Sequence, residues 1–262
     1  MNLGIIGYGN IGELLVQNIL NLENNDFNKL YISNRHIDKI EFLKDNEIVI
    51  CTDSNIEVSQ NCEKIIICVQ TPMFFDVVEE IYPHINENTH LIYCCAGIDT
   101  EKRLEKYQNN MTCIIPTIAS TYDGKNHKKG VSLIKHDEKV SRENKNYIEN
   151  LFNEFSTIKI VEDENELEIL TLTTSCMPAF ISLALEKLAG QLSQNSDIEK
   201  EEYLKLLINT NMSTSQLLNE NTLNNKEIIK KVATKNGITE KGLNFLDDEL
   251  IEVYKNLIEI IM

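Results

Sequence analysis

The sequence has no tryptophan, only four prolines and ten glycines, and few basic residues among its 262 positions. Lysine and arginine number 25 against 41 aspartates and glutamates, which gives a formal net charge of −16. Such a chain repels nucleic acid unless it segregates a basic patch, and the clearest basic stretch is the short run 125–129. We therefore expect no nucleic-acid partner.

Long apolar runs and targeting signals are also missing. No uninterrupted run approaches the roughly 20 apolar residues that span a bilayer. A glycine-rich motif begins within the first ten residues, where a signal peptide would have its charged and apolar regions. We expect a cytoplasmic protein that has no membrane partner.

The seven cysteines show no C-x-x-C spacing, and the five histidines are scattered without a carboxylate or cysteine at ligand spacing. Several of the cysteines lie in apolar runs, where cysteine behaves as a small buried hydrophobe. We expect neither a disulfide framework nor a metal site.

The most informative stretch is 3–20, LGIIGYGNIGELLVQNIL, an apolar run followed by three glycines and then apolar residues at helical spacing. This is the Gly-x-Gly-x-x-Gly turn of a dinucleotide-binding βαβ unit, in which a strand leads into a helix whose free N–H groups face a pyrophosphate. A tight turn that binds nothing is the alternative interpretation. We expect cofactor contacts from Gly7, Tyr8, Gly9, Asn10, Ile11 and Gly12.

Apolar strand patterns alternate with helical patterns as far as residue 161, which predicts an α/β fold with a Rossmann-type doubly wound sheet. We expect two domains, a NAD(P)-binding domain at 1–162 and an all-α substrate and dimerisation domain at 163–262. Strands are expected at 3–6, 29–32, 48–51, 64–69, 90–94, 112–115, 131–134 and 157–161, and helices between them at 36–44, 55–62, 73–81 and 142–155.

The second predicted strand ends in Ser33-Asn34-Arg35, with no carboxylate before Asp38. NAD-binding units usually place an acidic residue here for the ribose 2′-hydroxyl, whereas NADP-binding units supply a cation. We therefore expect Ser33, Asn34 and Arg35 to bind NADPH in preference to NADH. Arg35 could instead be an ordinary solvent-facing residue at a helix start.

Two further strand ends should reach the cofactor, because ligands in doubly wound sheets bind beyond the carboxyl ends of the strands. One is Cys68, Val69, Gln70 and Thr71, and the other contains the small residues Ala96 and Gly97. Small residues there would let the nicotinamide half approach closely, although they are equally compatible with an ordinary turn.

The segment from Asp163 onward carries apolar residues at helical spacing, and Pro178 should kink or restart its first helix. Further helices are expected at 199–219, 225–232 and 243–261. These helices are too apolar for a small solitary bundle. We expect a homodimer, or a higher oligomer built from dimers.

Two segments of this half, TSCMPAF at 174–180 and VATKNGITEKGL at 232–243, resemble the pyrroline-5-carboxylate reductase family. They match that family's Ser-Gly-Ser-Gly-Pro-Ala-Tyr helix and its Val-x-Ser-Pro-Gly-Gly-x-Thr substrate turn. The glycine motif, the Ser33-Asn34-Arg35 strand end, Val69, Ala96-Gly97 and Pro116 follow the family's order along the chain.

The resemblance implies reduction of a cyclic imine acid, pyrroline-5-carboxylate, to proline by NADPH. It further implies that Asn236, Gly237, Ile238 and Thr239 hold the substrate carboxylate through backbone N–H groups ahead of a helix. Thr239 would be the catalytic residue that hydrogen-bonds the ring nitrogen, although it could also be a simple helix cap.

Several positions depart from the family pattern, namely Gln70, Thr71, Cys113, Thr117, Lys235 and Asn236. Similar departures occur in the family's divergent late-competence (ComER-like) branch. Two alternatives therefore stay open: a cofactor-binding regulatory protein, and a reductase of another imine or keto acid whose site would include the long loop 118–129.

Overall fold

The computed structural model describes residues 1–23, 26–107, 111–121 and 130–261. The chain divides into two compact units, 1–181 and 182–262, which are treated separately below. The loop at 118–129 is the candidate segment for the choice of another substrate, and from 122 onward it lies outside the described residues.

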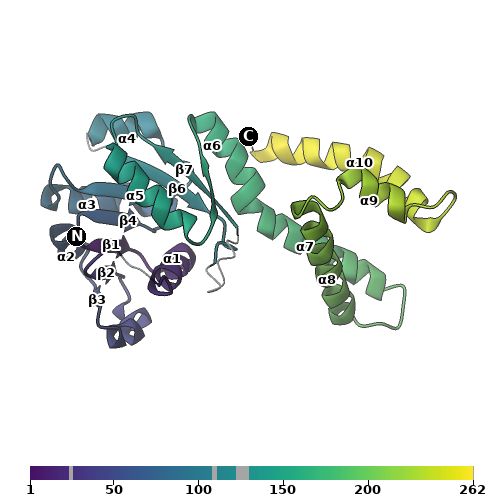
Figure 1. Ribbon diagram of the computed structural model, residues 1–262, viewed down its shortest axis with the longest axis horizontal. Coiled ribbons are helices and arrows are strands. Elements are labelled where there is room, and N and C mark those ends of the chain that lie inside the picture. Colours follow the sequence, from purple (N-terminus) through teal and green to yellow (C-terminus); the bar gives the residue numbers. More distant parts are fainter. Residues whose placement is uncertain (24–25, 108–110, 122–129, 262) are drawn as a thin grey trace. The chain divides into compact units, whose positions relative to one another are not determined.

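The first unit is built on an eight-stranded sheet of order β3-β2-β1-β4-β5-β6-β7-β8 (Figure 1). All neighbouring strands are parallel except β6 and β7, which are antiparallel. The first six positions have the order of a dinucleotide-binding fold, so the predicted fold class is confirmed. The strands are β1 (Leu3–Ile6), β2 (Leu30–Ser33), β3 (Val49–Thr52), β4 (Lys64–Ile67), β5 (His90–Tyr93), β6 (Met111–Pro116), β7 (Val131–His136) and β8 (Thr157–Ile160).

Helices cover both faces of this sheet, and each face has its own apolar core. On one face, α1 (Asn10–Leu20) packs Leu15 and Ile19 over β1, and α5 (Arg142–Asn153) packs Phe152 over β7 and β8. On the other, α2 (Asn55–Asn61) packs Val58 over β1 and β2, and α3 (Phe74–Ile81) packs Phe74 against Tyr93 of β5. Two buried layers on one sheet make this unit self-contained.

The predicted helix at 36–44 is wrong in type. The chain forms two short 3-10 helices there, η1 (Ile37–Lys39) and η2 (Glu41–Asp45). Ile37, Ile40 and Leu43 recur every three residues and pack on the core, with Ile40 fully buried. A three-residue spacing keeps side chains on one face of a 3-10 helix, whose turn has three residues.

Helix α4 (Thr100–Lys106) was not predicted; it begins after Asp99, whose side chain accepts a hydrogen bond from the Lys102 N–H. Its one buried residue is Arg103, which forms a bidentate ion pair with Asp137. Because a charged side chain takes the inward position, the helix shows no apolar periodicity to detect. Smaller 3-10 turns lie at η3 (Thr71–Met73) and η4 (Tyr82–His84).

A single helical stretch, Glu164–Ser193, leads out of the first unit. It consists of α6 (Glu164–Thr171), a π-helical turn η5 (Leu172–Cys176) and α7 (Met177–Ser193). Pro178 follows the π-helical turn directly, inside this continuous stretch, so the helix does not end there. The π turn changes the regular bonding at the point where proline has no N–H to donate to residue i−4.

This stretch also bears on the expectation that the chain has no membrane partner. Its most apolar window has a mean hydropathy of 1.5, and only 6% of that window is buried, so by length and composition alone it could cross a membrane. Threonines, serines and Pro178 interrupt the apolar residues, which is why no continuous run marks this stretch in the sequence.

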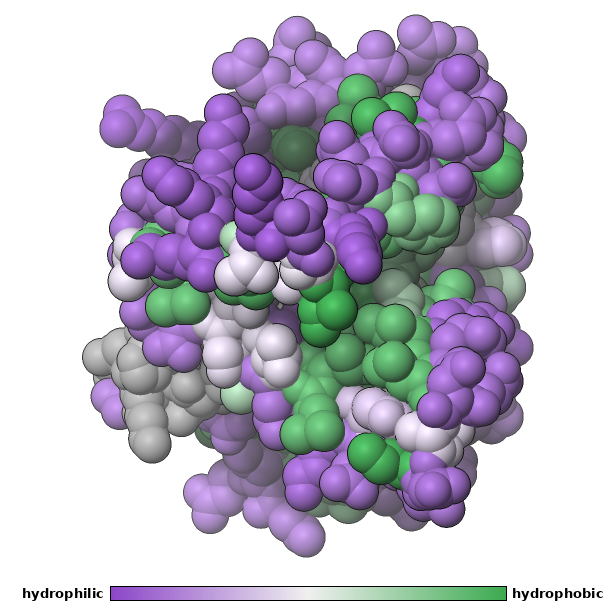
Figure 2. Space-filling view, turned by 90° about the vertical axis from the view of Figure 1, so that its right-hand side faces the viewer, coloured by the Kyte–Doolittle hydropathy of each residue, from purple (hydrophilic) through white to green (hydrophobic). Residues whose placement is uncertain are grey.

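The second unit contains the end of α7 with α8 (Lys200–Asn219), α9 (Asn225–Val232) and α10 (Ile238–Ile261). None of the described residues in α8, α9 or α10 is buried. On the face of the molecule shown in Figure 2, apolar surface forms a broad area between polar margins. Exposed apolar side chains of this unit include Leu206, Met212, Phe245, Ile251 and Ile260.

Candidate active site

The three glycines of the turn lie in three different surroundings. Gly7 has a φ of +97°, in the left-handed region that favours glycine, and its N–H donates to the Ser33 carbonyl at 2.9 Å. A Cβ on Gly12 would lie 2.0 Å from the Gly7 carbonyl oxygen, so only glycine lets α1 approach β1 this closely. A Cβ on Gly9 would meet nothing within 4 Å, which leaves open space beside the N-terminus of α1.

A cavity of about 580 Å³ lies next to that open space, at the carboxyl ends of β1, β4 and β5. It is lined by Gly9, Asn10, Ile11, Cys68, Val69, Gln70, Thr71, Pro72, Cys94, Cys95 and Ala96. Three segments that are remote in sequence thus meet where a doubly wound sheet binds its ligand. The lining residues Pro72, Cys94 and Cys95 were not among the predicted contacts, although their position directly at strand ends could have identified them.

The other predicted cofactor residues lie outside the cavity lining. Gly7 and Gly12 shape the turn, and Gly97 ends its loop in the left-handed region with a φ of +71°. The Tyr8 N–H donates to Asn34 Oδ1 at 3.2 Å, so the glycine turn and the end of β2 are tied together.

The Ser33-Asn34-Arg35 segment divides into one inward and two outward residues. Ser33 is fully buried and its hydroxyl donates to Asn55 Oδ1 at 2.8 Å, which corrects the expectation that this hydroxyl is free for a ribose phosphate. The Asn34 amide donates to the His36 carbonyl. Arg35 is exposed and makes no ion pair with any described residue, so its guanidinium is available to a phosphate.

The ends of β4 and β5 are joined across the cavity by two side-chain hydrogen bonds. The Thr71 hydroxyl donates to the Ala96 carbonyl at 3.0 Å, and the Cys95 thiol donates to the Val69 carbonyl at 3.1 Å. Burial raises the pKa of Cys95 to about 12, so this thiol stays protonated at neutral pH and is no nucleophile. The pair of bonds fixes the strand ends against which a nicotinamide ring would lie.

The predicted substrate turn belongs to the second unit. Asn236 has a φ of 61°, in the left-handed region, where asparagine is among the few residues other than glycine that fit readily. Asparagine in place of the family's first glycine therefore preserves the turn. The Gly237 N–H donates to the Thr234 carbonyl at 2.9 Å, and a Cβ on Gly237 would lie 2.9 Å from that same carbonyl oxygen.

Two details of this turn differ from the expectation. Helix α10 begins at Ile238, five residues earlier than predicted, so Ile238 and Thr239 form its first turn and do not precede it. The N–H groups of Asn236 and Gly237 are already bonded, the former to the Glu240 carboxylate at 2.7 Å. Glu240 was not predicted, although glutamate three residues after a helix cap is a known capping pattern.

Two family models match the chain, one over each half. Residues 2–97 match the model described as NADP oxidoreductase, coenzyme F420-dependent, and residues 164–260 match that of pyrroline-5-carboxylate reductase dimerisation. Together with the glycine turn and the cavity at the strand ends, the first match defines the class as a dinucleotide-dependent oxidoreductase.

Relatives define the family more narrowly. The chain is 52% identical over 248 residues to a pyrroline-5-carboxylate reductase of Methanobrevibacter smithii, covering 94% of this chain and 97% of that protein. It is 28% identical over 258 residues to pyrroline-5-carboxylate reductase 3 of Bacillus subtilis, with 98% and 93% coverage. This chain belongs to the pyrroline-5-carboxylate reductase family.

The late-competence resemblance is weaker by the same measure. ComE operon protein 4 of Bacillus subtilis is 22% identical over 261 residues, covering 99% of this chain and 93% of that protein. Among solved structures, the pyrroline carboxylate reductase of Plasmodium falciparum with NADP bound has a TM-score of 0.82 at 20% identity, covering 100% of this chain and 95% of that one. That likeness supports the fold.

Proposed function

We propose that this protein is an NADPH-dependent oxidoreductase that acts on a C=N bond and reduces pyrroline-5-carboxylate to proline. The observation that carries the proposal is the 52% identity to a pyrroline-5-carboxylate reductase over nearly the whole length of both chains. The cavity at the strand ends supports it, because the family's cofactor-binding segments meet there.

The residues present fit a dinucleotide. The open space at Gly9 and the start of α1, where no side-chain cap is present, suit a pyrophosphate. Arg35, which forms no ion pair within the described part of the chain, suits a 2′-phosphate. Val69, Gln70, Thr71 and the small Ala96 would hold the nicotinamide half, with Gly97 allowing the turn behind it. When bound, the reduced cofactor supplies the hydride that the imine carbon accepts.

The substrate's carboxylate and ring nitrogen need separate partners. The N–H groups of Asn236 and Gly237 already form hydrogen bonds within the turn. We therefore assign the carboxylate to the N–H groups of Ile238 and Thr239, the first two residues of α10. The Thr239 hydroxyl then orients the ring nitrogen and relays a proton to it from water.

We further propose that the chain works as a homodimer in the cytoplasm, with residues 1–162 binding cofactor and 163–262 binding substrate and the second copy. The dimerisation model covers 164–260, and that region leaves its apolar side chains exposed in a single chain. A second copy, and no membrane, would then cover the apolar helix Glu164–Ser193. The resemblance to the family further implies that the neighbouring subunit completes the substrate pocket.

The test is a steady-state assay of the purified chain with pyrroline-5-carboxylate and each cofactor. We expect NADPH oxidation in step with proline formation, with a larger kcat/KM for NADPH than for NADH. Tight NADPH binding without any turnover would contradict the proposal and would favour a regulatory protein or a different imine or keto acid.

A further inference from the structure

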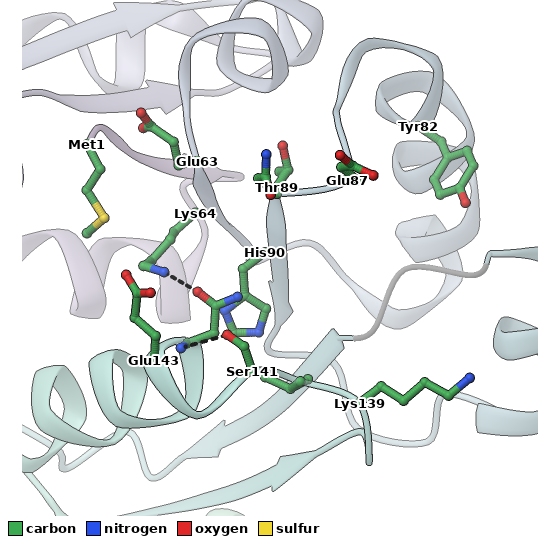
Figure 3. Close-up of a pocket in the computed structure, with 13 residues that line it drawn as sticks. Met1, Glu63, Lys64, Tyr82, Glu87, Thr89, His90, Lys139, Ser141 and Glu143 are labelled. Carbon is green, nitrogen blue, oxygen red and sulfur yellow. Dashed lines mark hydrogen bonds between the residues drawn. The ribbon is translucent and has the colours of Figure 1, made fainter.

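A second cavity, of about 610 Å³, lies at the opposite edge of the sheet, where β4 and β5 begin (Figure 3). It exists because β7 runs antiparallel to β6 and so delivers its carboxyl end, and the helix that follows, to the edge where the parallel strands start. The first turn of α5 therefore lines this cavity together with Glu63, Lys64, Glu87 and His90. The proposed cofactor and substrate residues are all elsewhere.

Two polar side chains at the floor of this cavity are almost completely buried, Lys64 at 6% and His90 at 2% exposure. Lys64 Nζ donates to Asn144 Oδ1 at 2.5 Å and lies 4.8 Å from the centre of the Tyr147 ring. An ammonium group has three donors, so hydrogen-bonding capacity remains on Lys64. Figure 3 shows Lys64 and the His90 ring approaching the start of α5 from neighbouring strands.

A chain of hydrogen bonds fixes the tautomer of His90. Glu149 Oε1 lies 3.2 Å from His136 Nε2, and because a carboxylate only accepts, that nitrogen carries the proton. Burial lowers the pKa of His136, so its ring carries one proton at neutral pH. His136 Nδ1 then accepts from the Thr112 hydroxyl at 2.8 Å, and the Thr112 oxygen in turn accepts from His90 Nε2 at 2.9 Å.

The consequence is that His90 Nδ1 is an acceptor, and no described residue donates to it. Burial, followed by the charge of Lys64, lowers the pKa of His90 to about 3, so the ring is neutral at physiological pH. A buried acceptor without a donor is unfavourable, and a ligand N–H or O–H at this atom would satisfy it.

The charges around the cavity have both signs. Lys64 and the N-terminus of α5, capped by Ser141, favour an anionic group, whereas the carboxylates of Glu63, Glu87 and Glu143 favour a cationic one. A simple anion would be repelled by the three carboxylates. A metal ion is also a poor fit, because the described residues contain no group of three or more histidine, cysteine or acidic side chains that could hold one.

We propose that this cavity is a second ligand site, which binds a small zwitterionic amino acid. Its carboxylate lies against Lys64 and the N-terminus of α5, and its ammonium group donates to His90 Nδ1 and faces Glu63. Proline, the product of the proposed reaction, is a small zwitterion of this kind and is therefore the first ligand to test. The site does not depend on that function, because any amino acid of similar size has the same two groups.

The experiment follows the side-chain ¹⁵N signals of His90 in the intact, NADPH-saturated protein during titration with proline. Acetate and pyrrolidine, which each carry one of the two groups, and glycine are titrated in parallel. We expect proline or glycine to shift the Nδ1 signal, with Nε2 remaining protonated, and each half-molecule to bind at least about tenfold more weakly. An unmoved Nδ1 signal at saturating proline and glycine, or an equal response to acetate, overturns the proposal.

The Lys64→Met variant keeps the length of the stem over Tyr147 and removes the charge, and we expect it to weaken this binding about tenfold or more. Lys135→Met is the matched control, a partly buried lysine of the same sheet that pairs with Glu164 and should leave binding unchanged. Glu63→Gln changes an exposed residue and should also weaken binding. It serves as the second test if the Lys64→Met variant does not fold. Unchanged binding in both site variants would contradict the proposal. Since these readouts record binding only, their failure is distinguishable from a failure of the reductase assay.

Discussion

The two units of this chain use similar apolar residues in opposite ways. In the first unit the apolar side chains of β1, β4 and β5 are fully buried between two layers of helices. In α8, α9 and α10 none of the described residues is buried, although leucine and isoleucine recur throughout. Composition therefore does not decide whether a segment folds alone; the availability of a covering layer does. We expect cofactor binding to be a property of the first unit, and assembly a property of the helices.

The largest expected effect is on assembly. Phe245 in α10 is 64% exposed in the single chain, and we expect Phe245→Glu to disrupt the dimer. Burying a phenylalanine contributes about 1.5–3 kcal/mol, and a twofold interface loses this contribution twice. The dissociation constant of the dimer should therefore rise a hundredfold or more. Sedimentation velocity over a concentration series measures it.

Phe42 in the first unit is the matched control for this change. It is 63% exposed, nearly the same as Phe245, so Phe42→Glu makes the same chemical change at a similarly exposed position. Phe42 lies within residues 1–162, where we expect no dimer interface. The Phe42 variant should remain a dimer. Equal dissociation of both variants, or of neither, would remove the contrast between the two units.

Next in size is the contrast between two glycines of one turn. Gly12→Ala forces a methyl group to within 2.0 Å of the Gly7 carbonyl oxygen, and we expect a loss of about 1–3 kcal/mol or more in the free energy of unfolding. Gly9→Ala meets open space and should change stability by less than about 1 kcal/mol. It should nevertheless weaken NADPH binding by roughly tenfold or more, because the methyl enters the place of the pyrophosphate. Urea unfolding and fluorescence titration separate the two effects, and similar stability losses would refute the assignment of roles.

Arg35 tests cofactor choice within the first unit. Loss of one charge-assisted contact costs about 1.5–3 kcal/mol, so Arg35→Ala should weaken NADPH roughly ten- to a hundredfold and leave NADH nearly unchanged. Titration of both cofactors measures this. Lys39→Ala, an exposed lysine four residues further on, is the control for general loss of positive charge. A parallel loss for both cofactors would show that Arg35 does not contact the 2′-phosphate.

The smallest expected effect is in the substrate turn of the second unit. Thr239→Ala should lower kcat/KM for pyrroline-5-carboxylate by roughly tenfold, since a hydrogen bond that strengthens in the transition state contributes more than its ground-state value. NADPH affinity should not change. Gly237→Ala should act mainly on KM, because its methyl would press against Thr234 and distort the turn. Thr239→Ala with full activity would take that residue out of the mechanism.

Much of the first unit was predictable because its signals are local. The glycine turn, the buried strands and the strand ends that line the cofactor cavity all follow from short sequence patterns. The errors arose where a tertiary partner decides the outcome. Helix α4 is hidden because Arg103 takes its inward position opposite Asp137, and Ser33 was assigned to the cofactor although Asn55, from another segment, takes its hydroxyl.

The helical half was predictable in outline and less so at the site. The early start of α10 at Ile238 was missed because Asn236 and Gly237 resemble a loop in sequence. The Glu240 carboxylate bound to the Asn236 N–H stabilises that start, and no apolar periodicity reveals it. The resemblance to the reductase family identified the turn, whereas only the backbone geometry shows which of its N–H groups are bonded within the turn itself.

The most direct test of the contrast between the units is to measure NADPH affinity and turnover together on the Phe245→Glu protein, across the concentrations at which it dissociates. We expect the dissociation constant for NADPH to stay within about twofold of the wild-type value, while pyrroline-5-carboxylate reduction per chain falls in proportion to the dimer fraction. A monomer with full turnover, or a monomer that no longer binds NADPH, would contradict the assignment of cofactor binding to the first unit and of reduction to the assembled helices.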